Sequence, residues 1–218
     1  ASNTKTLASA ESRAAVTPAP AATATTTNNP VINATFYYTE VNRQALDQFA
    51  EEAQSSGQFT DFGDFKSGLI PEVGKRMNRQ SGVVVLQRVS RTFDSKNLQQ
   101  QWFVGNKSQD GQDTGITTHI SLDTSAPGRL RGEIELLKSF PEAAAGGWSL
   151  KKSSSPVMNF DLAAKQGLMV FMALPHDIPQ DPNEITGPEG IMHIFNSPAF
   201  KNSLSEFTLF IDFDTSVP

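Results

Sequence analysis

The sequence contains no cysteine among its 218 residues, and this absence excludes several kinds of chemistry. Without thiols the chain can form no disulfide, cysteine nucleophile or cysteine-ligated metal site. Basic runs are missing too, and the densest basic stretch is KRMNR, from Lys75 to Arg79. Because the net charge is -5, the chain lacks the counterion-releasing attraction to phosphates that dominates nucleic-acid affinity. We therefore do not expect a free-standing nucleic-acid-binding protein.

Long apolar runs and histidine clusters are absent as well. The longest apolar run, GLMVFMALP from Gly167 to Pro175, is less than half the roughly 20 residues that span a bilayer, so we expect no membrane association. The histidines at positions 119, 176 and 193 do not have the spacing of metal ligands. The nucleophile elbow GxSxG and the phosphate-binding glycine motifs do not occur. These absences predict no metal site, no cofactor and no enzymatic activity.

What is present divides the chain near residue 30. Residues 15–30 read AVTPAPAATATTTNNP, which carries too little apolar surface to offset the entropy lost on ordering. We predict a flexible Ala/Thr/Pro-rich N-terminal arm over residues 1–30 and a single β-sandwich domain over residues 31–218.

One amphipathic helix is predicted just after the first strand of this domain. Its apolar residues recur every four positions at Ala45, Phe49 and Ala53, with Thr39 as the expected N-cap and Gly57 as the expected end. The aromatic-rich stretch that follows, residues 58–76, predicts an irregular, aromatic-anchored loop that could include a short helical turn.

Strand patterns dominate the rest of the chain and are separated by clusters of Gly, Pro, Asp and Ser. Many short strands with punctuated turns indicate an antiparallel sandwich rather than alternating strands and helices. We predict an all-β fold, an antiparallel jelly-roll sandwich of about 8–10 strands with the one N-terminal amphipathic helix. The expected strands are 31–40, 82–93, 98–105, 115–123, 128–140, 147–152, 156–163, 168–175, 190–195 and 207–214.

Paired carboxylates are the best candidates for a catalytic site. Glu133 and Glu135 lie two residues apart in GEIELL, and Asp212 and Asp214 do so in the closing strand FTLFIDFD, so each pair shares one strand face. Sandwich-fold glycosidases use two carboxylates on one sheet face. A solvated strand face also carries alternating acids, and basic residues near the glutamates suggest ordinary cross-strand charge pairing.

Aromatic side chains are candidates for contacts with other molecules. Trp102 and Trp148 flank turns, and either could line a sugar site or anchor an interface. The evenly spaced Phe59, Phe62 and Phe65 form a further candidate interface, although such a stripe is also typical of core packing.

Two stretches of the chain resemble a known family. GRLRGEIELL resembles the Gly-led strand that opens the second half of the sheet in coat proteins of small icosahedral positive-strand RNA viruses. FTLFIDFDTSVP resembles their last long strand, an aromatic–aliphatic alternation that ends in Phe-Asp. The nearest likeness is to the jelly-roll subunits of picorna-like plant viruses, such as the comovirus group. Many other RNA virus coat proteins have an Arg-rich arm, whereas the arm here has only Lys5 and Arg13.

This resemblance implies a structural protein, a capsid subunit that self-assembles into an icosahedral shell around the genome. Its partners would be copies of itself and other coat subunits, with weak contact to packaged RNA through Lys75, Arg76 and Arg79, and its location would be the virion. Two alternatives stay open. One is a secreted β-sandwich that binds or cleaves carbohydrate, and the other is a component of a phage particle.

Overall fold

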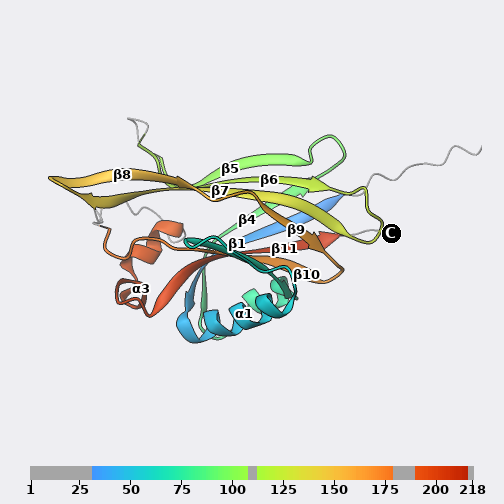
Figure 1. The fold of residues 1–218 in the computed structure, drawn as a ribbon, viewed down its shortest axis with the longest axis horizontal. Helices are drawn as coiled ribbons and strands as arrows, with labels where there is room; N and C mark the ends of the chain where they lie inside the picture. Colours follow the sequence, from blue (N-terminus) through green and yellow to red (C-terminus); the bar gives the residue numbers. More distant parts are fainter. Residues whose placement is uncertain (1–30, 108–111, 179–189, 216–218) are drawn as a thin grey trace, which may run out of the picture.

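The computed structural model describes residues 31–107, 112–178 and 190–215, so the predicted arm lies outside the described residues. The described chain forms two antiparallel sheets that face each other as a sandwich (Figure 1). The all-β prediction is therefore confirmed.

Sheet A has the strand order β2-β3-β10-β11-β1-β4, and sheet B has the order β5-β6-β7-β8, with β9 also paired to β7. Sheet A consists of β1 (Ile32–Asn42), β2 (Thr60–Asp61), β3 (Phe65–Pro71), β4 (Val83–Phe93), β10 (Gln166–Met172) and β11 (Ser205–Thr215). Sheet B consists of β5 (Gln99–Asn106), β6 (Thr114–Asp123), β7 (Leu130–Ala144), β8 (Gly147–Ser154) and β9 (Met158–Leu162).

The first and last strands lie side by side in the middle of sheet A. β1 and β11 pair along their full length, from Ile32 opposite Thr215 to Asn42 opposite Ser205. In sheet B the strands β5 to β8 instead form a meander in which successive strands are neighbours, and β9 pairs with β7 rather than with β8. A jelly roll is built from two Greek keys. This meander does not establish that topology, so the sandwich is confirmed and the jelly roll is not.

The main core fills the space between the two sheets. Phe207, Leu209, Ile211 and Phe213 point into it, as their alternation predicts, and each is 8% exposed or less. The closing strand is therefore part of the fold's centre, because these four apolar side chains meet those of sheet B.

A second, smaller core lies on the outer face of sheet A. The predicted helix is α1 (Arg43–Ser55), and it buries Ala45, Phe49 and Ala53 as expected. Phe49 packs on Phe210 of β11 with ring centroids 4.8 Å apart. The central strands of sheet A are thus buried on both faces, and Figure 1 shows α1 lying against the sheet on the side away from sheet B. The N-cap is Asn42, whose Oδ1 accepts from the Ala45 N–H at 2.8 Å, rather than the predicted Thr39.

Two local predictions are wrong. The stretch expected to be an irregular loop contains the strands β2 and β3, which were missed because β3 is buried on both faces and so shows no alternation. The helical turn that the same stretch allowed is the short helix α2 (Val73–Met77). The segment 190–195, expected to be a strand, belongs to the 3-10 helix η1 (Ile191–Asn196). Its buried residues fall at 191, 192, 194 and 195, which is a helical rather than an alternating spacing. The four-residue helix α3 (Pro198–Lys201) follows it.

Candidate functional site

The two predicted carboxylate pairs lie on opposite outer faces of the sandwich. Glu133 and Glu135 flank Ile134, which points into the core, so both face outward from sheet B. Asp212 and Asp214 face outward from sheet A, because Phe213 between them points into the core. The whole inter-sheet core, about 10 Å thick, therefore separates the pairs, and the fold does not combine them into one site.

The sequence predicted that the basic residues near Glu133 and Glu135 pair with these glutamates. In the structure these basic residues, Arg131 and Lys138, pair with other carboxylates. Arg131 lies 3.3 Å from Asp161, and Lys138 lies 2.9 Å from Asp64. Within the described residues neither Glu133 nor Glu135 takes part in a salt bridge. The sequence placed the basic side chains near the acids, but strand pleating turns Lys138 inward while the glutamates face outward.

Asp212 is the enclosed member of the aspartate pair. Burial raises the pKa of its carboxyl above the usual value, the neighbouring Asp214 raises it further, and a hydrogen bond from the Gly74 backbone N–H opposes this shift. A β-carbon at Gly74 would lie only 2.1 Å from Oδ2 of Asp212, so only glycine lets α2 approach this closely. Asp212 and Asp214 line a polar groove beside α2 with Lys75, Arg79 and Lys165, among others.

The three basic residues predicted to face RNA have different environments. Arg76 makes two hydrogen bonds to Glu52, at 2.5 and 2.9 Å, and its guanidinium stacks 4.5 Å above the ring of Phe49. Arg76 is thus held against α1, which makes the prediction wrong for this residue. Lys75 pairs with Glu72 at 2.6 Å, and Arg79 is exposed.

The five candidate interface aromatics divide into buried and exposed side chains. Trp102 is 8% exposed and Phe65 is 3% exposed, so both belong to the core and the interface prediction is wrong for them. Phe59 is partly buried against the α1 core. Phe62 is 45% exposed and Trp148 is 46% exposed, so these two are free to contact another molecule.

Trp148 lies at the end of a projecting ribbon formed by β7 and β8 (Figure 1). Residues 143–149, which we call the hairpin tip, are all exposed, so neither face of the ribbon is covered there. Across the base of the tip Lys151 bonds to Glu142 at 2.9 Å, and this bond raises the pKa of Lys151. An uncovered two-stranded ribbon is only marginally stable alone. At the hairpin tip, Trp148 is therefore an exposed aromatic side chain at the end of a two-stranded extension of the sandwich.

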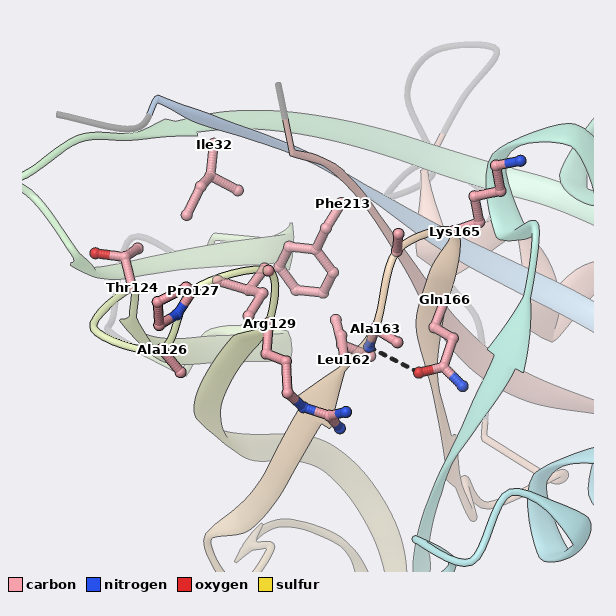
Figure 2. Close-up of a pocket in the computed structure, with 13 residues that line it drawn as sticks. Ile32, Thr124, Ala126, Pro127, Arg129, Leu162, Ala163, Lys165, Gln166 and Phe213 are labelled. Atoms are coloured by element: carbon pink, nitrogen blue, oxygen red, sulfur yellow. Dashed lines mark hydrogen bonds between the residues drawn. The ribbon is translucent and has the colours of Figure 1, made fainter. Parts of the chain in front are cut away.

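The opposite end of the sandwich contains an apolar pocket of about 240 Å³, which we call the end pocket (Figure 2). Ile32 from the start of β1, Phe213 from the end of β11, Leu130 and Leu162 line it and are each 8% exposed or less. Thr124, Arg129 and Gln166 line it as well. Figure 2 shows the side chain of Lys165 pointing away from the cavity. Turns at residues 124–129 and 163–166 form the rim.

Sequence patterns gave no signal for a buried polar cluster at the other end of β1. Glu40, 8% exposed, accepts hydrogen bonds from the hydroxyls of Ser197 and Ser205, each at 2.5 Å. Nearby, Glu206 contacts Arg43 at 2.7 Å and His176 at 3.4 Å. The histidine thus contacts a carboxylate rather than either serine, which is an arrangement for holding chain segments together. No motif links these positions, because they lie up to 166 residues apart in the chain.

Comparison with known proteins identifies no relative. No family model, no curated protein and no solved structure matches the chain significantly. In the described ranges, no three His, Cys, Asp or Glu side chains gather closely enough to hold a metal ion. The described helices include none that is long and apolar enough to cross a membrane.

Proposed function

We propose that this chain is a structural protein, a coat subunit that self-assembles into an icosahedral shell enclosing an RNA genome. Its partners are copies of itself and other coat subunits, and its place is the virion. The observation that carries the proposal is the hairpin tip, which extends an uncovered ribbon with a half-exposed Trp148 away from the sandwich. Exposed aromatic anchors of this kind are enriched at the centres of protein interfaces. The resemblance of GRLRGEIELL and FTLFIDFDTSVP to coat-protein strands supports the same function.

The mass of the natively purified protein tests this proposal. Light scattering and negative-stain electron microscopy should find uniform particles whose mass is many multiples of the 23.6 kDa chain. A chain that stays monomeric or dimeric in every assembly condition would contradict it. Particles of a different symmetry, such as a tail or decoration complex, would favour the phage alternative.

A carbohydrate-binding or carbohydrate-cleaving role is the second candidate, and one observation favours it. Glu133 lines an open groove of about 450 Å³ together with Asn159, Asp161 and Arg131. Such convergent polar groups suit sugar hydroxyls. Replacing Glu133 and Glu135 by Gln should then abolish glycan turnover, and a glycan array should show binding by the wild-type chain. If the array shows no binding, this candidate is excluded.

A further inference from the structure

Sheet B has an outer face that no described helix covers, in contrast to sheet A, whose outer face carries α1 (Figure 1). We propose that this face packs against the same face of a second copy, with the two copies related by a two-fold axis. The proposal rests on the self-association that the proposed function requires, and it specifies one contact through which this occurs.

A row of side chains across the middle of this face is partly apolar. Leu137 on β7 lies opposite Thr117 on β6, which lies opposite Phe103 on β5. We call these three residues the central row. Phe103 and Leu137 are partly exposed and belong to neither core, because the odd-numbered residues of β7 and their neighbours in the sheet point away from sheet A. An apolar row that is uncovered in the single chain suits the middle of an interface.

Charged residues lie on both sides of the central row in an arrangement that is complementary to itself. Glu135 lies two residues from Leu137 on β7, and Lys152, opposite Ser139, lies equally far from the row toward the hairpin tip. Within the described residues neither Glu135 nor Lys152 takes part in a salt bridge. A two-fold axis along the central row exchanges the two positions, so Lys152 of each copy faces Glu135 of the other.

The same axis places the hairpin tip on the far end of the partner's face. Trp148 lies opposite Ala143, six residues along β7 from Leu137, and Arg131 lies six residues from Leu137 in the other direction. Trp148 of one copy therefore meets Arg131 of the other, whose side chain is 51% exposed. An indole ring against a guanidinium is a favourable cation–π contact. The open groove around Arg131 is otherwise lined by acids, which suit the lysine beside the tip: Asp123, Glu133 and Asp161.

The area of the face is that of a stable interface. From Arg131 to Ala143 it is roughly 40 Å long at about 3.3 Å per residue, and four strands about 4.8 Å apart make it roughly 19 Å wide. The face thus measures on the order of 800 Å², which matches the area that each partner buries in a standard protein–protein interface. Sheets that pack face to face keep their strand directions within about 30° of each other, and a two-fold axis across the strands provides this alignment.

Charge reversal tests the contact. Below the concentration at which particles form, wild-type protein should sediment as dimers. Lys152→Glu and Glu135→Lys should each raise the dimer dissociation constant at least about tenfold, because each substitution disrupts two charge pairs per dimer. The double variant should restore the wild-type value, and failure to restore it would overturn the proposal. Lys151→Gln, on the opposite face of the same strand, is the control and should leave the constant unchanged.

Cysteine cross-linking locates the axis, because the wild-type chain has no cysteine. Thr117→Cys lies on the central row, so a short bis-maleimide should link it to the same position of the second copy. Asp123→Cys lies six residues further along β6, so its two copies should be roughly 40 Å apart and stay unlinked. Linked Asp123→Cys together with unlinked Thr117→Cys would overturn this two-fold contact.

The two proposals fail in distinguishable ways. If wild-type particles form and Thr117→Cys does not cross-link within them, only the contact across sheet B is overturned. If Thr117→Cys cross-links and the charge reversals behave as expected, but no particles form in any condition, the contact holds and the proposed function fails. A chain that stays monomeric throughout contradicts both.

Discussion

The two tryptophans show how differently one residue type is used in two regions of this molecule. Trp102 lies between the sheets, donates its Nε1–H to the Tyr38 hydroxyl at 2.9 Å, and meets Phe36 edge-on with ring centroids 4.5 Å apart. Trp148 lies on an uncovered ribbon and is 46% exposed. The comparison teaches that the sandwich centre uses aromatic area for folding, while the hairpin tip leaves it available for association.

The largest effect should follow from removing the buried tryptophan. Trp102→Ala leaves a cavity between the sheets and should lower the free energy of unfolding by about 3–5 kcal/mol. Urea denaturation followed by circular dichroism measures this loss. In the same experiment Trp148→Ala should change the value by no more than about 0.5 kcal/mol, since its side chain packs on little. Equal losses of stability from the two substitutions would contradict the assignment of Trp102 to the core and of Trp148 to the exposed tip.

A smaller loss should follow from removing the hydroxyl that Trp102 bonds. The Tyr38 hydroxyl also shares a hydrogen bond with the Thr118 hydroxyl at 3.0 Å. Tyr38→Phe therefore leaves the buried Thr118 hydroxyl and the Trp102 Nε1–H without this partner. We expect a loss of about 1–3 kcal/mol in the free energy of unfolding. Thr118→Val should cost less, because the bond between Trp102 and Tyr38 remains.

Tyr38 also makes a prediction about alkaline pH. Burial raises its pKa from 10.0 to about 12, so the folded state holds this proton more tightly than the unfolded state. The stabilisation is fully present below pH 10 and is lost as the pH rises towards about 12. Wild-type protein should therefore lose more stability than Tyr38→Phe between pH 10 and 12 in urea titrations, and parallel losses would show that Tyr38 is not enclosed.

The exposure of Trp148 gives a spectroscopic test of the same comparison. In a Trp102→Phe background Trp148 is the remaining tryptophan, so its emission and its quenching by acrylamide report on the hairpin tip alone. Free subunits should show strong quenching, and assembled particles should show weaker quenching with emission at shorter wavelength. Unchanged quenching in particles would show that the tip stays in solvent.

The smallest effects concern two carboxylates, the half-buried Asp212 and the ion-paired Asp161, whose pKa values are shifted in opposite directions. Burial raises the pKa of Asp212, so its ionisation costs stability above its folded pKa and nothing below pH 3.8, where both states are protonated. Asp212→Asn should thus be more stable than wild type at pH 7 but not at pH 3. A hydrogen bond from Arg129 lowers the pKa of Asp161, so Asp161→Asn should show the opposite sign. Urea midpoints at the two pH values measure both differences.

Sequence reasoning succeeded where one periodicity determines one environment. The apolar residues of α1 recur every four positions and match its one buried face. In β11, Phe207, Leu209, Ile211 and Phe213 alternate and match the face toward sheet B. It failed for β3, where burial on both faces hides the alternation, and for the segment 190–195, whose short apolar run suits a strand or a helical turn. Candidate sites were harder to predict, because exposure depends on which strands become neighbours.

The sequence by itself determined the all-β class, the position of the helix and the inward side of the closing strand, because these follow from local spacing of apolar residues. Only the tertiary structure decided that β5 to β8 form a meander, that Arg76 is held by Glu52, and that the carboxylate pairs lie on opposite faces. It also separated Trp102 from Trp148, although both flank turns in the sequence. The physical reason is that burial is a property of packed layers, and strands far apart in the chain form those layers.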